Sequence, residues 1–283
     1  MKSMIKYNAV TEDNPNINLE HPPTMQPIVV KIENEKLIGT FFKTAGNEKN
    51  PIVFLLHGFP GNEVNYDIAH AIRRFGFNVV VFHYRGSWGS SGNFSISNSL
   101  EDVNFIIEHF SKPEIADEFN YNKDKIILIG HSMGGFLSLI TSMKYPNIKN
   151  IASLAGFNFG LFTDYILTHP EFKEITMEGL ASGAELVTNS NAEKLFNEMV
   201  KNRENWNIAK RASELKEKNI LIIAAEFDTV APSELHNTPL VYSLKKAEVC
   251  VNSQVLQCGH SFSSMRIKLT TEIINWLGSL TFN

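Results

Sequence analysis

Short apolar segments alternate with longer amphipathic segments along most of the chain. The apolar segments are nearly continuous and cover residues 52–56, 78–82, 125–129, 151–154, 220–225 and 249–256. Strands that are covered on both faces have this character. Parallel strands also need crossover helices between them. The pattern therefore predicts an α/β fold, in which helices lie on both faces of a mostly parallel central sheet.

Two further strands are predicted ahead of this alternation. Residues 28–33 and 36–42 have the pattern of a hairpin turning at Asn34-Glu35, and would add antiparallel strands at one edge of the sheet. The sheet then has about eight strands. Residues 1–27 are polar and contain four prolines, so we expect an irregular arm over the surface.

Helical periodicity fills the long stretch between residues 154 and 220, where Ser190 and Glu193 form a capping box ahead of an amphipathic helix. A chain of 283 residues with 43% hydrophobic residues can bury the core of one large domain with an insertion. We predict one domain over residues 28–283, with a helical lid inserted at about residues 157–205.

Charge and cysteine content exclude several classes of partner. The 26 basic and 30 acidic residues are mixed along the chain, so no basic face indicates nucleic acid.

No apolar run is long enough for a signal peptide or a membrane span, so we expect a cytoplasmic protein without a membrane partner. Cys250 and Cys258 lack the spacing of a redox or zinc pair and are interpreted as structural thiols. No self-complementary stripe predicts an oligomeric state.

A candidate nucleophile follows the apolar segment 125–129. The sequence Gly-His-Ser-Met-Gly-Gly covers residues 130–135, and an amphipathic helix reaches from there to Tyr145. A bare G-x-S-x-G occurs often by chance, so the motif needs its context. A serine on a sharp turn between a buried strand and a helix, flanked by small residues, has the context of a nucleophile elbow. We therefore predict Ser132 as a nucleophile.

A serine hydroxyl needs a base, and the base needs an acid behind it. In a parallel sheet, functional groups gather at the carboxyl ends of the strands. His260 follows the segment 249–256 and is the predicted base. Asp228 follows the segment 220–225 and is the predicted acid, with Glu226 as the alternative. Four other histidines are less suitable as the base. His57 and His83 precede the serine in the chain. His131 would point away from the serine, and His236 lies in a predicted helix.

The tetrahedral intermediate of acyl transfer needs N–H donors for its negative charge. The amide that follows the nucleophile, here that of Met133, supplies one donor in such turns. The loop His-Gly-Phe-Pro-Gly at residues 57–61 follows the strand 52–56 and could direct the amide of Phe59 to the same place. These two amides are the candidate oxyanion hole.

The order Ser132, Asp228, His260, with residues 57–61 ahead, resembles the α/β-hydrolase superfamily over about residues 28–280. The resemblance implies a nucleophile, an acid and a base in that order. Within the superfamily the chain is similar to bacterial cinnamoyl and feruloyl esterases, which share a short helical lid. Residues 84–92 also resemble a loop of acyl-peptidases of the prolyl oligopeptidase kind. Those enzymes carry a large propeller domain in front, which we do not expect from a 27-residue irregular arm.

The predicted reaction is acyl transfer through an acyl-enzyme, without a metal or an organic cofactor. No zinc-binding H-E-x-x-H motif and no dinucleotide-binding G-x-G-x-x-G after a strand occurs. We expect a small-molecule ester of a small, medium or aromatic acid as substrate. Five aromatic side chains are candidates for contacting it: Trp88, Phe157, Phe159, Phe162 and Tyr165.

Other functions remain open at this stage. An aminopeptidase or acyl-peptidase, a thioesterase or an acyltransferase could use the same three residues. An acidic side chain of the lid that holds a substrate amine would favour a peptidase, and Glu171, Glu174 and Glu178 could supply it. The third hypothesis is a binding protein on an inactive hydrolase fold. The presence of Ser132, Asp228 and His260 together disfavours it.

Overall fold

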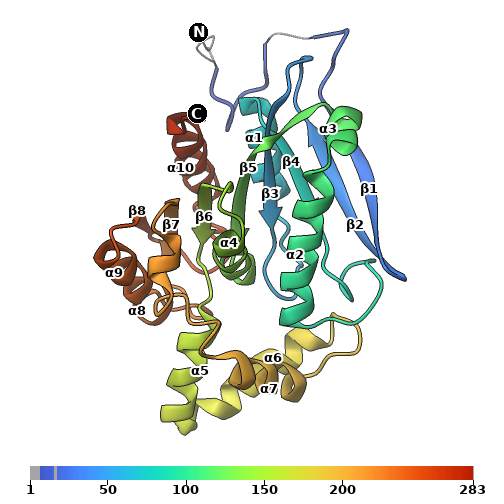
Figure 1. Ribbon diagram of the computed structural model, residues 1–283. Coiled ribbons are helices and arrows are strands. Elements are labelled where there is room, and N and C mark those ends of the chain that lie inside the picture. The colour runs from blue at the N-terminus through green and yellow to red at the C-terminus, as the bar shows by residue number, and fades with distance from the viewer. Residues whose placement is uncertain (1–6, 16–17, 283) are drawn as a thin grey trace.

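An eight-stranded sheet runs through the centre of the molecule, in the order β1-β2-β4-β3-β5-β6-β7-β8 (Figure 1). The computed structural model describes residues 7–15 and 18–282. The hairpin β1–β2 joins β4 in antiparallel fashion, and all later pairs are parallel. The strands are β1 (Thr24–Ile32), β2 (Glu35–Lys43), β3 (Asn50–Leu56), β4 (Asn78–Phe82), β5 (Tyr121–His131), β6 (Asn150–Leu154), β7 (Asn219–Ala225) and β8 (Cys250–Leu256). The predicted mostly parallel α/β fold is confirmed.

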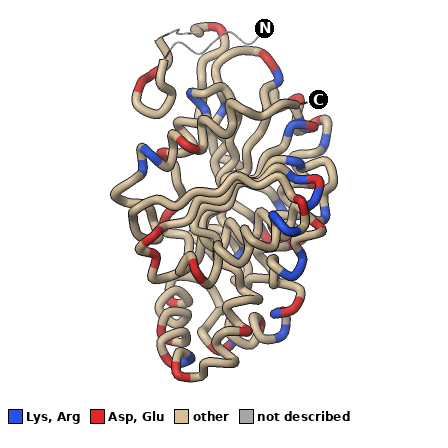
Figure 2. Tube along the Cα trace, turned by 90° about the vertical axis from the view of Figure 1, so that its left-hand side faces the viewer, with Lys and Arg blue, Asp and Glu red and all other residues tan. Residues whose placement is uncertain are grey.

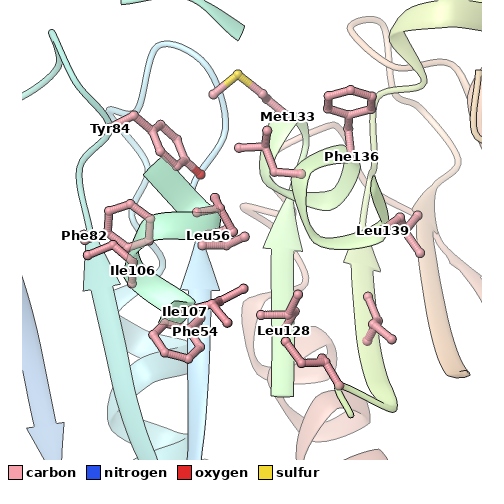
Figure 3. Packing of buried hydrophobic residues seen from close by; sticks show 14 of the residues in the cluster. Phe54, Leu56, Phe82, Tyr84, Ile106, Ile107, Leu128, Met133, Phe136 and Leu139 are labelled. Atoms are coloured by element: carbon pink, nitrogen blue, oxygen red, sulfur yellow. The ribbon is translucent and has the colours of Figure 1, made fainter. Parts of the chain in front are cut away.

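Two hydrophobic cores lie on opposite faces of this sheet. One core contains side chains of α1 (Tyr66–Phe75) and α10 (Arg266–Ser279). The other contains side chains of α2 (Ile96–Phe110), α3 (Pro113–Phe119), α4 (Met133–Lys144) and α9 (Thr238–Lys246), together with side chains from residues 159–215. Figure 3 shows part of this second core, where side chains of β3, β4 and β5 meet those of α2 and α4. Helices therefore cover both faces of the sheet, as a parallel sheet requires.

The two edges of the sheet differ from the prediction. Strand β1 begins at Thr24 and includes Pro27, which the prediction placed in the arm. An edge strand tolerates proline because the missing N–H need not serve a second neighbour. Strand β8 pairs with β7 and leaves most of its side chains at least partly exposed, Cys250 among them. Residues 249–256 are therefore an edge strand and are not covered on both faces.

The predicted arm is described only in part. Residues 7–15 and 18–23 form turns and bends, and the side chain of Arg74 on α1 hydrogen bonds to the carbonyl oxygens of Ala9 and Val10. Residues 1–6 and 16–17 lie outside the described residues.

The stretch between β6 and β7 forms helices that lie together beyond the carboxyl ends of the strands (Figure 1). We call residues 157–205 the insertion. Its elements are α5 (Phe159–Thr168), the 3₁₀ turn η1 (Pro170–Phe172), α6 (Lys173–Ala184) and α7 (Ala192–Asn202). The short η2 (Ala212–Leu215) follows it, and α8 (Ser233–His236) comes after β7. The cap of α7 is Asn191, whose side chain accepts from the amide of Lys194, so the predicted capping box of Ser190 and Glu193 is wrong.

Charged residues lie mainly on the helices and loops around the central sheet, with both signs interspersed (Figure 2). The central strands carry few of them. Within residues 7–15 and 18–282, no helix is long and apolar enough to cross a membrane.

The insertion is attached to the body at the start of α2. The carboxylate of Glu198 on α7 accepts hydrogen bonds from the amides of Ile96 (2.9 Å) and Ser97 (2.8 Å). The first amides of a helix have no partner within the helix, so this carboxylate satisfies two of them. A residue of the insertion thus caps a helix of the body.

We expect Glu198→Ala to lower the free energy of unfolding by on the order of 1–3 kcal/mol, because two helix amides lose their acceptor. Chemical denaturation measures the change. The neighbouring variant Asn197→Ala, at an exposed position of the same helix, should leave stability nearly unchanged. Equal stability of the two variants would contradict the capping role of Glu198.

Candidate active site

Ser132 lies on the turn between β5 and α4, with φ 56° and ψ −119°. A side-chain-bearing residue rarely adopts a positive φ, and in α/β hydrolases such a turn presents the nucleophile above the sheet. Neighbouring strands hold the turn in place. The amide of Ser132 donates to the carbonyl of Leu154 (2.9 Å), and its carbonyl accepts from the amide of Phe157 (3.1 Å). The strand, sharp turn and helix expected at this motif are present.

The glycines of the motif are required by the close approach of backbones. A Cβ on Gly130 would lie 2.0 Å from the carbonyl oxygen of Gly134. A Cβ on Gly134 would lie 2.1 Å from the carbonyl oxygen of Leu56, the last residue of β3. Neither neighbour is a side-chain end that could turn aside. The G-x-S-x-G spacing is therefore a packing requirement of this turn and not the signature of a flexible loop.

His260 and Asp228 meet at the carboxyl ends of β8 and β7. The distance from Nδ1 of His260 to Oδ2 of Asp228 is 2.7 Å. The other carboxylate oxygen accepts from the amides of Val230 (2.9 Å) and Ala231 (2.7 Å). A carboxylate can only accept, so Nδ1 carries the proton and Nε2 is left as the basic nitrogen. Glu226, the alternative acid, is exposed.

Two opposing effects set the charge of Asp228. Burial favours the neutral acid and raises its pKa, but the hydrogen bond and charge of His260 and the two loop amides lower it more. The net pKa of Asp228 lies below its ordinary value. The carboxylate is therefore ionised behind the imidazole, as an orienting acid must be.

His131 joins the turn of Ser132 to His260. Its Nε2 donates to the carbonyl oxygen of His260 (2.9 Å), and the two ring centroids lie 4.8 Å apart. Burial, with a smaller effect of His260, lowers the pKa of His131 to about 4, so the ring stays neutral at pH 7. Sequence reasoning set His131 aside as a side chain pointing away from the serine, and missed its contact with His260. Its only signal in the sequence is its place beside Ser132.

The loop at residues 57–61 lies against Ser132. A Cβ on Gly58 would come within 2.9 Å of the Cβ of Ser132 and 3.4 Å of its Oγ. Phe59 is the next residue, and Met133 is the first residue of α4, where amides have no acceptor within the helix. The structure thus brings both candidate oxyanion-hole segments to Ser132.

The five candidate substrate-binding aromatics have different surroundings. Phe157 is bonded to the turn of Ser132, and its ring lies 4.9 Å from that of Phe162. Trp88 is 44% exposed and donates from Nε1 to the carbonyl of Pro60 (2.7 Å), so it borders the loop at residues 57–61. These three side chains remain candidates.

The other two aromatics lie in different packing environments. Phe159 is buried in the core, where its ring packs against those of Phe136 and Trp206. Tyr165 stacks on His169 within the insertion. Phe159 therefore has a packing role in the core, and its contact with a substrate, like that of Tyr165, stays a prediction.

His236 is a second residue that sequence reasoning set aside. It is fully buried on α8, and its Nδ1 accepts from the amide of Asn158 at the start of α5 (2.9 Å). Its ring packs on Phe157 with centroids 4.3 Å apart. Burial lowers the pKa of His236 to about 3, so the ring is neutral. It connects the beginning of the insertion to the element that follows Asp228.

Among residues 7–15 and 18–282, no group of three or more His, Cys, Asp or Glu side chains is arranged to hold a metal ion. The buried thiol of Cys258 lies near Asp228, and burial raises its pKa. It is a protonated thiol at neutral pH.

The family of the chain follows from its sequence as well as its geometry. A sequence model of the α/β hydrolase fold family matches residues 51–197, more than half of the chain, and the protein belongs to this family of hydrolases. The chain is 32% identical over 169 residues to "Epoxide hydrolase 4" of Mus musculus. That match covers 58% of this chain and 44% of the relative, so the chain spans less than half the length of that curated protein.

Solved structures share the fold at low sequence identity. The acylaminoacyl peptidase of Pyrococcus horikoshii has a TM-score of 0.68 and 17% identity, and the likeness covers 94% of this chain and 43% of that one. Est1E from Butyrivibrio proteoclasticus has a TM-score of 0.63 and 15% identity, with 89% and 96% of the two chains covered. At these identities the likeness shows the fold alone.

The neutral state of His236 has a consequence for acid stability. Its pKa of about 3 in the folded protein lies below the value of about 6.5 in an unfolded chain. Between these values the unfolded chain binds a proton that the folded protein does not, so stability is lost as the pH falls below about 6.5.

We expect His236→Asn, whose side-chain oxygen can accept from Asn158, to reduce this acid sensitivity. Near pH 5 the dependence of the unfolding free energy on pH should become shallower by about 1.4 kcal/mol per pH unit. Denaturant titrations at several pH values between 4.5 and 7.5 measure it. An unchanged slope would show that His236 is already protonated in the folded state.

Proposed function

We propose that the protein is a serine hydrolase that cleaves carboxylic esters of small, medium or aromatic acids through Ser132, His260 and Asp228. One observation carries the proposal. The strained turn that presents Ser132 is joined through its neighbour His131 to the same histidine that Asp228 orients. Three groups with the chemistry of a nucleophile, a base and an acid therefore lie at the carboxyl ends of the strands.

The proposed reaction has two acyl-transfer steps. The Oγ of Ser132 attacks the ester carbonyl while Nε2 of His260 accepts its proton, and the amides of Phe59 and Met133 receive the developing negative charge. Asp228 holds the imidazole in the required tautomer and favours its charged form. The alcohol leaves with the proton from His260. Water then attacks the acyl-enzyme in the same manner and releases the acid.

The nucleophile also distinguishes ester cleavage from epoxide hydrolysis, the activity named for the mouse relative. An epoxide opened by Ser132 would leave a serine alkyl ether, which has no carbonyl carbon for water to attack. An ester leaves an acyl-serine, which water can hydrolyse with the same base. The serine at this position therefore favours acyl substrates.

The surroundings of the serine favour an uncharged acyl group. Phe157 and Phe162 offer apolar surface beside its turn. Three acidic residues of the insertion were considered as anchors for the amine of a peptide substrate, and all three are exposed: Glu171, Glu174 and Glu178. This arrangement supports an esterase over an aminopeptidase, and small or aromatic acyl groups over charged thioesters.

Replacing Ser132 with Ala should lower kcat for p-nitrophenyl butyrate by at least about a thousand-fold, because the nucleophile is lost. A fluorophosphonate probe should label the wild-type protein at Ser132 and leave the variant unlabelled. Ser138→Ala is the control, since that buried hydroxyl hydrogen bonds within α4. Undiminished turnover in the Ser132 variant would refute the assignment.

A substrate panel tests the proposed class. We expect measurable kcat/KM for short-chain and aromatic-acid esters. Values for aminoacyl amides and epoxides should be at least about a hundred-fold lower, because the three acidic residues considered as amine anchors are exposed and a serine alkyl ether cannot turn over. Thioesters in the panel test the thioesterase alternative, and an added alcohol acceptor tests the acyltransferase alternative. Preferred cleavage of an aminoacyl amide would instead establish the peptidase alternative.

A further inference from the structure

We propose that Tyr84 and Trp88 are positioning residues that hold the loop at residues 57–61, so that the amide of Phe59 is fixed beside Ser132. The inference rests on the proposed serine-hydrolase function. It concerns two residues that follow β4 and do not belong to the three reacting groups.

The loop at residues 57–61 needs outside support because of its own composition. Gly58 must lack a side chain to approach Ser132, and Gly61 has φ 103°, in the region that favours glycine. Gly58 leaves the Gly58–Phe59 peptide, which carries the Phe59 amide, with more conformational freedom than another residue would. An oxyanion donor must lie within about 2.7–3.1 Å of the charged oxygen to be effective, so a mobile amide would be a weak one.

Tyr84 holds the beginning of this loop. Its hydroxyl donates to the carbonyl oxygen of His57 (2.9 Å), and the two ring centroids lie 4.4 Å apart. Figure 3 shows the hydroxyl pointing toward the end of β3, near Leu56. The side chain is fully buried, and burial raises the pKa of Tyr84 well above its ordinary value. The hydroxyl is therefore a permanent donor.

Trp88 holds the end of the loop. Its Nε1 donates to the carbonyl oxygen of Pro60 at 2.7 Å, and a Cβ on Gly61 would lie 2.8 Å from the same nitrogen. The two side chains thus bond to the carbonyls of His57 and Pro60. The peptide that carries the Phe59 amide lies between these two bonds.

The segment that carries both side chains is itself firmly attached. Arg85 binds the fully buried carboxylate of Asp102 through its backbone amide (2.7 Å) and its Nε (2.5 Å). Thr188 of the insertion donates to the carbonyl of Gly86 (2.7 Å) and accepts from the amide of Phe94 (3.0 Å). The support of the loop therefore rests on both α2 and the insertion.

The insertion also contacts Phe59 directly. On the body side, the ring centroids of Phe59 and Phe94 lie 5.2 Å apart. A Cβ on Gly183 of α6 would lie 2.2 Å from a ring carbon of Phe59. A Cβ on Gly179, on the same helix, would have nothing within 4 Å. The two glycines form a matched pair for testing contact with the loop.

The test compares Tyr84→Phe and Trp88→Phe with the wild type. Each should lower kcat for p-nitrophenyl butyrate by about 10- to 100-fold with KM changed less than about two-fold, because the amide serves the transition state more than the bound ester. Affinity for a benzyl trifluoromethyl ketone should fall in parallel. Ser132 adds to its carbonyl, the proton passes to His260, and the resulting oxyanion needs the same amides.

Two variants control for lost stability alone. Tyr121→Phe removes another buried hydroxyl that donates to a backbone carbonyl, that of Phe110. Trp276→Phe removes an indole whose Nε1 has no partner among the described residues. Both should keep wild-type kcat and ketone affinity. If the Tyr84 and Trp88 variants matched these controls in both measurements, the inference would be overturned.

A third comparison moves the loop without removing a hydrogen bond. Gly183→Ala should displace Phe59 and lower kcat and ketone affinity together, whereas Gly179→Ala should leave both unchanged. Equal behaviour of the two variants would count against the inference. A wild-type protein that neither cleaves esters nor reacts with the fluorophosphonate would overturn the proposed function and this inference with it. Activity retained in all loop variants would overturn the inference alone.

Discussion

The contact between the Ser132 turn and the backbones around it is the constraint on which the site depends. Gly134 lies against the carbonyl of Leu56, and Gly130 lies against Gly134, so β3, β5 and α4 pack with their backbones in close contact. This packing fixes the positive φ of Ser132 and places Gly58, two residues after Leu56, against its side chain. The strain of one turn is thus maintained by a whole layer of the fold.

Around this turn the polar groups are buried and mostly neutral. Burial lowers the pKa of His57 to about 3, and that of His131 to about 4, so neither ring competes with His260 for a proton at pH 7. The buried charge nearest to His260 is then the carboxylate of Asp228, which hydrogen bonds to it. A low-dielectric surrounding with one oriented charge suits the imidazolium that the proposed acyl transfer would form.

The sequence predicted the centre of the sheet well, because strands buried on both faces, such as residues 78–82, are marked by continuous apolar residues. It predicted the strands at both edges but missed two details there: β1 already includes Pro27, and residues 249–256 are not covered on both faces, because an edge strand lacks one neighbour. The three candidate reacting residues were found because each follows a strand. His131 and Tyr84 were not assigned their contacts, because a side chain that acts on a distant backbone carbonyl leaves no local pattern.

The insertion is hydrogen bonded to the body at several places. Phe157 is bonded to the carbonyl of Ser132, Thr188 to the segment after β4, and Glu198 to the start of α2. An insertion attached only by apolar packing could shift as a unit without affecting the chemistry. One that is hydrogen bonded at these places cannot move without straining the backbone at the nucleophile or the support of the Phe59 loop. The geometry of the candidate reacting groups therefore depends on the position of the insertion relative to the body.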